Sequence, residues 1–340
     1  MKQTDFARIL TRFLSDYLPS QRNLSTNTIK SYRDTFKQVL MYFNQELNIK
    51  PEHLTFEEIK AEKVKAFLIW LEKTRNISIN TRNQRLAAIH SFFRYTQSEL
   101  PENILECQRI LGIPFKKRGK KMIEFLSQEC LRYILEQPDT NTKKGRRDLT
   151  LMAILYDTGA RVQELIDLDI RDVRLTKPTT ITLTGKGRKR RSVPIMEKTR
   201  ILLESYMQEN RLSENGMQDH PLFYNSNRHP FTRPGITYIL EKHLKKAKES
   251  YPEILFTDRL NPHMFRHTKA MHLLEAGVNL IYIRDLLGHV SVTTTEIYLK
   301  ANTEIKRKAL ESSFMDVITQ DTPVWDEDTD LLKWLQEFCR

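Results

Sequence analysis

The sequence predicts a mainly α protein with two domains, an N-terminal helical bundle followed by an α+β domain that holds a small antiparallel sheet. Its 340 residues are enough for about two hydrophobic cores. Apolar residues recur at helical spacing through residues 1–112, a basic stretch without that spacing follows at 113–122, and two β-branched stretches flank a glycine-bearing loop within 180–195. We therefore expect a first domain at 1–112, a linker, a second domain at 123–314 and a tail at 315–340.

The N-terminal domain is expected to contain four helices that share one core. Apolar side chains at steps of three and four residues mark the stretches 6–13, 29–43, 64–71 and 86–93. Ser25 and Thr26 precede the second stretch and are candidate caps. One face of each helix can close on the core, which is the pattern of a small bundle. The opposite faces carry cations, among them Arg82 and Arg85, which are either solvated charges or contacts to an acidic partner.

The linker at 113–122 is strongly basic. Ile113-Pro114-Phe115 opens it, and the proline and Gly119 argue against a continuing helix. Its cations are Lys116, Lys117, Arg118, Lys120 and Lys121. Such a segment is either a solubilising spacer or, between two basic domains, a linker that crosses the phosphate backbone of a nucleic acid.

The second domain alternates between helices and one hairpin. Helices are expected at 125–137 and 147–158, and Gly159 can end the second in a left-handed conformation. The β-branched stretches 180–184 and 192–195 flank Gly185-Lys186-Gly187-Arg188-Lys189-Arg190, which predicts a short hairpin with a basic tip. Further helices are expected at 197–210, 234–248, 263–276 and 279–287.

The tail at 315–340 differs from the rest of the chain because it is acidic. Its apolar residues fall at i, i+3, i+4 and i+7, which predicts a short amphipathic helix. These residues are Leu331, Trp334, Leu335 and Phe338. The plainest role for such a helix is to pack on its own domain.

Composition narrows the class of partner. A net charge of +12 and a pI near 9.5 favour a polyanion, since clustered cations gain by releasing phosphate counterions. Three widely spaced cysteines without a CxxC pair indicate neither a disulfide framework nor a zinc site, as expected in a reducing cytoplasm. The sequence shows no signal-peptide core and no run of about 18 apolar residues, so we expect a soluble, intracellular, nucleoid-associated protein with no membrane partner.

Five short motifs follow one another in the second domain. They are Thr158-Gly159-Ala160-Arg161-Val162-Gln163-Glu164-Leu165, Gly185-Lys186-Gly187, His263-x-x-Arg266-His267, Leu286-Leu287-Gly288-His289 and Thr294-Thr295-Glu296-Ile297-Tyr298. In this order and spacing they resemble the tyrosine recombinases, also called the phage integrase family. The whole chain resembles the simple two-domain members, of Xer and transposon-integrase type. The resemblance implies a SAM-like core-binding bundle, a catalytic domain and a tail that docks on a neighbouring protomer.

The residue types in these motifs suit metal-free transfer of a phosphoryl group. Attack on a phosphodiester builds negative charge on its oxygens, which the guanidinium forks of Arg161 and Arg266 can meet. Tyr298 is the candidate nucleophile, and because a phenol has a pKa near 10 it needs a base, for which His263 on the helix face of Arg266 is placed. His289 follows a helix-ending glycine and can donate a hydrogen bond to the phosphate.

Each of these assignments has a plainer alternative. Arg161 alone would be a surface arginine after a helix cap, His263 a structural histidine, and His289 a capping residue. His267 we assign to packing or to a supporting hydrogen bond. What favours the catalytic interpretation is that all the motifs occur together and in order.

The leaving 5′-oxygen needs a general acid, and the resemblance points to the hairpin lysine, Lys186. Lys189 stands three residues away and is the alternative. Lys189 and the arginines around it, Arg188, Arg190 and Arg191, are expected to contact phosphate. The cations of the linker and two of the bundle are further candidate DNA contacts. The candidate contacts are Lys116, Lys117, Arg118, Lys120, Lys121, Arg188, Lys189, Arg190, Arg82 and Arg85.

The sequence therefore predicts a site-specific DNA recombinase that forms a 3′-phosphotyrosine and serves integration, excision or transposition of a mobile element. No metal or other cofactor is implied, because carboxylates do not cluster at ligand spacing with the motifs and no GxxxxGK[ST] occurs. The expected partners are double-stranded DNA with inverted-repeat sites and three further copies of the chain, joined through Leu331, Trp334, Leu335 and Phe338. Open alternatives are a chromosome-dimer resolvase, a type IB topoisomerase-like enzyme and a catalytically silent DNA-binding accessory.

Overall fold

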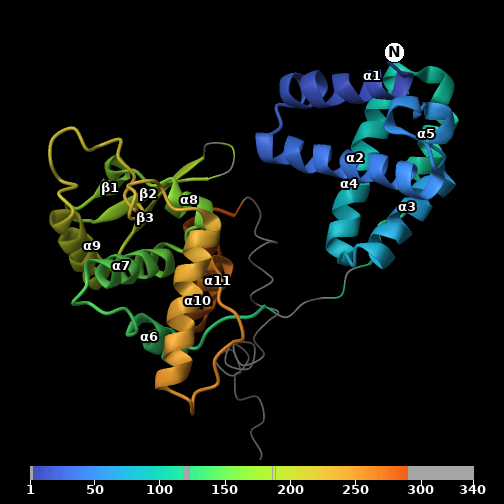
Figure 1. The fold of residues 1–340 in the computed structure, drawn as a ribbon. Coiled ribbons are helices and arrows are strands. Elements are labelled where there is room, and N and C mark those ends of the chain that lie inside the picture. The colour runs from blue at the N-terminus through green and yellow to red at the C-terminus, as the bar shows by residue number, and fades with distance from the viewer. Residues whose placement is uncertain (1–2, 118, 120–122, 186, 188, 290–340) are drawn as a thin grey trace, which may run out of the picture. The chain divides into compact units, whose positions relative to one another are not determined.

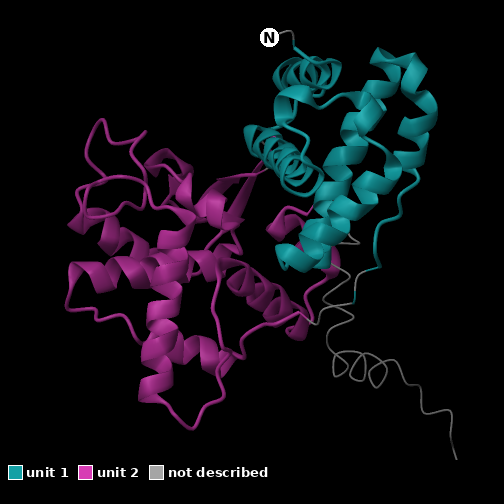
Figure 2. Cartoon of the chain, turned by 45° about the vertical axis from the view of Figure 1, so that its right-hand side comes forward, with its two compact units in different colours: residues 1–121 teal, residues 122–340 magenta. Residues whose placement is uncertain are grey.

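The computed structural model describes residues 3–117, 119, 123–185, 187 and 189–289. The chain divides into two compact units, residues 1–121 and 122–340 (Figures 1 and 2). Each unit has its own hydrophobic core. Within the described ranges, no helix is both long and apolar enough to span a bilayer.

The first unit is a helical bundle. Its helices are α1 (Asp5–Arg12), the π-helix η1 (Phe13–Gln21), α2 (Thr26–Leu47), α3 (Ala61–Thr74), α4 (Ile79–Glu99) and α5 (Ile104–Leu111), with 3-10 turns η2 (Pro51–His53), η3 (Phe56–Glu58) and η4 (Pro101–Asn103). Hydroxyls of Thr4, Ser25 and Ser78 accept from the first turns of α1, α2 and α4. Phe92 is fully buried at the centre of an aromatic core, with ring centroids 5.2 Å from Phe13.

The second unit combines seven α-helices with a three-stranded sheet among its described residues. The helices are α6 (Gln128–Leu135), α7 (Lys143–Thr158), α8 (Val162–Ile166), α9 (Glu197–Glu209), α10 (Arg233–Ser250), α11 (Pro262–Glu275) and α12 (Leu280–Leu287), with the 3-10 turn η5 (Ile170–Asp172). The antiparallel strands β1 (Val173–Arg174), β2 (Thr180–Thr184) and β3 (Arg190–Pro194) lie in the order β1-β2-β3. Alternate residues Ile181 and Leu183 of β2 point into the core because side chains on a strand alternate between faces.

The predicted fold class is confirmed: a helical N-terminal bundle precedes an α+β unit with a small antiparallel sheet. The differences lie in short or irregular elements. The five-residue helix α8 and the two-residue strand β1 are too short for a periodic signal, and α5 was not singled out as a separate helix. The first helix continues as a π-helix past Phe13, through Pro19, where no apolar stripe marks it.

Candidate active site

Arg161 lies at the junction between α7 and α8. Gly159 ends α7 in the left-handed conformation, with φ at 56°, and a Cβ there would come within 2.8 Å of the Leu287 side chain, so only glycine fits both demands. Arg161 caps α8 two residues later. Its guanidinium donates to Glu164 Oε1 at 2.7 Å and to the Gly288 carbonyl at 3.1 Å, and 35% of its side chain stays exposed.

Arg266 reaches the same place from α11. Asn261 caps this helix by accepting from the Met264 amide at 3.0 Å, and Pro262 occupies its first turn. Arg266 is buried, with 3% of its surface exposed, and donates to the Gly159 carbonyl at 2.7 Å and to the Leu287 carbonyl at 2.5 Å. It therefore ties the end of α7 to the end of α12.

At the C-terminus of α12, three consecutive backbone carbonyls each accept a hydrogen bond from a different arginine. Arg191 donates to Leu286, Arg266 to Leu287 and Arg161 to Gly288. The last carbonyls of a helix have no partner within the helix and carry the negative end of its dipole. Three arginines from distant parts of the sequence thus gather at a single helix end.

Glu164 supplies the countercharge for this cluster. It is 4% exposed and accepts from the Arg161 amide at 2.9 Å, from the Arg161 guanidinium and from Arg191 at 3.0 and 2.7 Å. Burial alone would raise the pKa of its carboxyl, but the hydrogen bonds and charges of Arg191 and Arg161 lower that pKa to about 2. Glu164 is therefore an anion at neutral pH and holds both guanidinium groups.

Three histidines beside the arginines have depressed pKa values. Desolvation lowers the pKa of His289 to about 4, with Arg266 and Arg161 adding to the effect. Desolvation, then His263 and Arg266, lower the pKa of His267 to about 4. His263 is exposed at the start of α11, yet partial desolvation and then Arg266 and Arg161 lower its pKa also. All three rings are neutral at pH 7, so His263 is able to accept a proton.

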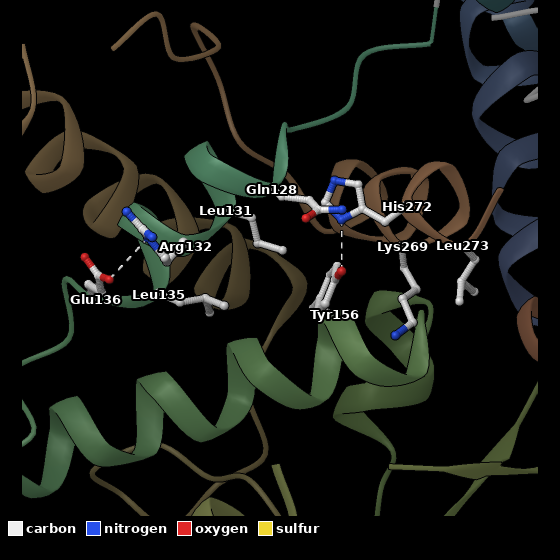
Figure 3. A pocket seen from close by; sticks show the side chains of 9 residues that line it. All are labelled: Gln128, Leu131, Arg132, Leu135, Glu136, Tyr156, Lys269, His272 and Leu273. Carbon is white, nitrogen blue, oxygen red and sulfur yellow. Dashed lines mark hydrogen bonds and ion pairs between the residues drawn. The ribbon is translucent and has the colours of Figure 1, made fainter. Parts of the chain in front are cut away.

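Further polar contacts join α11 to the end of α7, where Tyr156, Lys269 and His272 lie together (Figure 3). His272 Nε2 donates to the Leu126 carbonyl at 2.9 Å, which leaves Nδ1 to accept from the Tyr156 hydroxyl at 2.9 Å. Lys269 lies 3.4 Å from Asp157 Oδ1 and over the Tyr156 ring. These contacts hold α11 to the end of α7, one turn before Gly159.

A pocket of about 500 Å³ opens where the arginine cluster meets the hairpin. Its lining includes Arg161, Gly185, Lys189, Gly288 and His289. The amide of Gly185 donates to the Lys189 carbonyl at 2.8 Å and closes the tip of the β2–β3 hairpin. The structure thus brings together Arg161, His263, Arg266 and His289 with the described part of the hairpin. Lys186, Arg188 and Tyr298 lie outside the described residues.

Comparisons with known proteins bear on this arrangement. The model of the phage integrase family matches residues 124–304, and the model of the phage integrase N-terminal SAM-like domain matches residues 10–99. The chain belongs to the phage integrase family. It is a tyrosine recombinase, which is a class of DNA strand-transfer enzyme.

Relatives cover nearly the whole chain. It is 38% identical to the Sinorhizobium fredii protein y4rC, named as an integrase/recombinase, over 91% of this chain and 92% of that protein. It is 31% identical to the tyrosine recombinase XerC of Bacillus subtilis, over 88% of this chain and 93% of that protein.

Two solved structures share the fold of this recombinase. XerH in its pre-cleavage complex with difH gives a TM-score of 0.65 at 23% identity, over 88% of this chain and 84% of that chain. The Tn1549 transposon integrase in complex with transposon right end DNA gives 0.65 at 19% identity, over 88% and 98%.

The predicted DNA contacts fall into different environments. Lys116, Lys117, Lys189 and Arg190 are exposed, and Lys116 also pairs with Glu72 at 2.8 Å. Arg118, Lys120, Lys121 and the tail residues Leu331, Trp334, Leu335 and Phe338 lie outside the described residues. Among the described residues, no three His, Cys, Asp or Glu side chains form a metal-binding group.

Two of the predicted contacts serve the bundle itself. Arg82 is 7% exposed and donates to the Pro114 carbonyl at 3.3 Å, beside Asn83, which exchanges hydrogen bonds with the backbone of Lys116. Arg85 donates to the Ser31 carbonyl at 3.0 Å. These bonds hold the start of the linker and join α4 to α2.

Sequence reasoning missed Glu164 and counted Arg191 among the phosphate contacts around Lys189. Glu164 is the third residue after Arg161, and an acid at that position commonly reaches back to the cap amide of a helix. An acid within a motif of otherwise cationic function is the signal that could have found it. Nothing in the sequence distinguishes Arg191 from the cations beside it, because the distinction lies in which face of β3 it occupies.

Proposed function

We propose that the chain is a site-specific recombinase that cuts and rejoins DNA through a 3′-phosphotyrosine, in the service of a mobile element. The observation that carries the proposal is the convergence of four residues from three separate segments beside a basic hairpin. Arg161 and His289 line one pocket, and Arg266 and His263 belong to the same cluster of charges and hydrogen bonds. Fixed guanidinium groups in such a place stabilise charge that develops on a phosphate, and removing one such donor typically costs about 100- to 1,000-fold in rate.

In the proposed reaction Tyr298 is the nucleophile. Its phenolic oxygen bonds to phosphorus while the bond from phosphorus to the 5′-oxygen breaks, and His263 takes the phenolic proton. Arg161, Arg266 and His289 hold the non-bridging oxygens. A hairpin lysine, Lys186 in preference to Lys189, gives a proton to the 5′-oxygen. The 5′-hydroxyl of a second strand then attacks the phosphotyrosine and reverses the step.

The test is covalent capture on nicked DNA, from which the short fragment that carries the new 5′-hydroxyl diffuses away. The probes are nicked duplexes with randomised arms and duplexes cut from the DNA that flanks the gene. The wild-type chain should remain attached to DNA in denaturant, and Tyr298→Phe should not. Tyr282→Phe is the matched control, because that tyrosine is 72% exposed on helix α12. An adduct that survives in Tyr298→Phe contradicts the proposal.

The same captured DNA separates two roles. The likeness to the integrase/recombinase y4rC and to the fold of a transposon integrase supports a mobile element, while the likeness to XerC supports a resolvase of chromosome dimers. Captured sequences that coincide with the ends of the element carrying the gene favour the first role. A single chromosomal site unlinked to the gene favours the second.

Assembly through the tail is also part of the proposal. Four protomers on two DNA sites, joined by Leu331, Trp334, Leu335 and Phe338, would form the active complex. A chain ending at residue 330 should then bind a single half-site as the full chain does, and fail to bring two sites together in a pull-down of one labelled duplex by another. Pairing of sites by the shortened chain contradicts this part.

A further inference from the structure

Arg190 and Arg191 are neighbours on β3 with opposite environments. Successive side chains of a strand point to opposite faces. Arg190 is 65% exposed and lies 3.4 Å from Asp172, whereas the Arg191 side chain is 14% exposed and points toward the arginine cluster. The two therefore cannot be treated as one basic patch.

Every nitrogen of the Arg191 guanidinium donates within the protein. Nε donates to the Leu286 carbonyl at 2.9 Å, while Nη1 and Nη2 donate to the two oxygens of Glu164 at 3.0 and 2.7 Å. A guanidinium fork that is matched to a buried carboxylate in this way is rigid. Arg191 thus joins β3 to α8 and to the end of α12.

Gly288 shows how closely this arginine is packed. A Cβ at Gly288 would lie 2.9 Å from Arg191 Nη1, and the φ of 64° already favours glycine. The Arg191 guanidinium therefore rests on the backbone that leads into His289. A side chain at this position would push Arg191 away from Glu164 or shift the end of α12.

Arg191 also lies close to the hairpin tip. Arg191 lies opposite Leu183 in the sheet, and Arg190 lies opposite Thr184, one residue nearer the tip. The hydrogen bond between Gly185 and Lys189 follows and closes the tip. Arg191 is thus two residues from Lys189, and its side chain is fixed to the element that positions Arg161.

From this geometry we infer that Arg191 is a positioning residue, which holds the β2–β3 hairpin against the Arg161 pocket so that a hairpin lysine meets the leaving 5′-oxygen. The inference rests on the proposed function, since it presumes cleavage assisted by a hairpin acid. Without the Arg191 fork, the hairpin would keep its own ladder but lose its attachment to Glu164 and α12. Cleavage should then suffer mainly at protonation of the 5′-oxygen.

The experiment uses two forms of the DNA captured by the wild-type chain. One has the ordinary 5′-oxygen at the scissile phosphate, and the other has sulfur in its place. A thiolate leaves without a proton, so the sulfur substrate does not need the general acid. Single-turnover attachment of the full chain is measured on both, with Lys186→Ala and Arg161→Gln as references for a lost acid and a lost phosphate contact.

Arg191→Gln should slow attachment to the oxygen substrate by about 100-fold, the low end of what general acid catalysis contributes. On the sulfur substrate it should come within about 10-fold of the wild type, as Lys186→Ala should and Arg161→Gln should not. Arg191→Lys keeps a cation beside Glu164 but loses the fork, so it should show a smaller defect with the same rescue. If Arg191→Gln fails to fold, the comparison is made with Arg191→Lys instead.

Arg146→Gln is the matched control, since Arg146 also places its fork on one carboxylate, Glu209, and donates to one carbonyl, that of Thr140, at the far end of α7. It should cleave both substrates as the wild type does. Wild-type rates in the Arg191 variants, or equal slowing on oxygen and sulfur, would overturn the inference. A wild-type chain that attaches to neither substrate would instead refute the proposed function.

Discussion

Arginines donate hydrogen bonds to backbone carbonyls in both units, but the other partners of these arginines differ between the units. In the bundle, Arg82 donates to the Pro114 carbonyl and Arg85 to the Ser31 carbonyl, and neither forms an ion pair with an acid among the described residues. In the second unit, Arg161 and Arg191 share the buried anion of Glu164 and a helix end. A hydrogen bond from an arginine to a backbone carbonyl therefore has a different effect in each unit. In the bundle it holds the backbone in place, and in the second unit it helps to align cations beside a pocket.

The difference teaches that a cation is defined by its partners rather than by its position in a basic sequence. Arg82 and Arg85 donate to carbonyl and hydroxyl oxygens of the bundle itself, and so they fix its backbone. A guanidinium group that is held by an anion but keeps part of its surface in a pocket, as that of Arg161 does, is oriented toward a ligand. Substitution of these arginines should therefore lower the stability of the bundle in the first unit and the rate of DNA cleavage in the second.

The largest expected effect is the loss of cleavage rate caused by Arg161→Gln. Because it removes one fixed donor to the phosphate, it should slow single-turnover attachment to captured DNA by about 100- to 1,000-fold at saturating protein. Arg82→Gln should instead lower the stability of the bundle by about 1–3 kcal/mol, because it leaves the Pro114 carbonyl unpaired, and should leave the cleavage rate of the bound chain unchanged. A cleavage defect of equal size in both variants would remove the distinction between the units.

An intermediate effect is expected on stability when the two kinds of ion pair are compared. Glu164→Gln leaves two guanidinium groups facing a neutral amide in a buried place, which should cost about 3 kcal/mol. Glu72→Gln breaks the more exposed pair with Lys116 in the bundle and should cost less than about 1 kcal/mol. Native-state hydrogen exchange of α8 and α12, and of α3, measures the two losses. Equal losses would contradict the assignment of Glu164.

Much of this contrast could be predicted from the sequence, and part of it could not. Helical periodicity placed the long helices, and the motif order brought out Arg161, Arg266, His263 and His289, because those signals are local. The three carbonyls at the end of α12 could not be predicted, since carbonyls carry no sequence mark. The burial of Arg82 was also hidden, because it depends on where the chain leaves α5 and turns back along α4.

A smaller effect is expected from pH. The folded pKa of His267 and of His289 is about 4, below the usual value of 6.5, so protons bind the unfolded chain more tightly. Their contribution to stability is complete above pH 6.5 and is lost as the pH falls toward 4. Glu164, with a pKa of about 2, adds to the loss only below about pH 4.5.

The second unit should therefore lose stability between pH 6.5 and 5, measured by urea unfolding with pulsed hydrogen exchange at a fixed labelling pH. In the bundle the comparable group is His90, whose pKa desolvation also lowers, so the bundle should lose less over the same interval. His267→Gln should flatten the curve of the second unit. A bundle as sensitive as the second unit would show that His267 and His289 are not the cause of the loss.

The smallest expected effect concerns Lys116, on the exposed start of the linker. If it meets a phosphate, Lys116→Ala should reduce the slope of log affinity against log salt concentration by about 1 and leave cleavage at saturating protein unchanged. Titration of captured DNA at several salt concentrations measures the slope. An unchanged slope would leave Lys116 as a partner of Glu72 alone.

The most direct test of the account is to identify the amino acid that carries the DNA. The wild-type chain is attached to captured DNA, digested with nuclease and trypsin, and examined by mass spectrometry. Trypsin should release residues 285–300 as one peptide, in which Tyr298 is the only tyrosine. The account predicts a nucleotide adduct on Tyr298 in that peptide. An adduct on any other residue, or attached DNA without one, would contradict it.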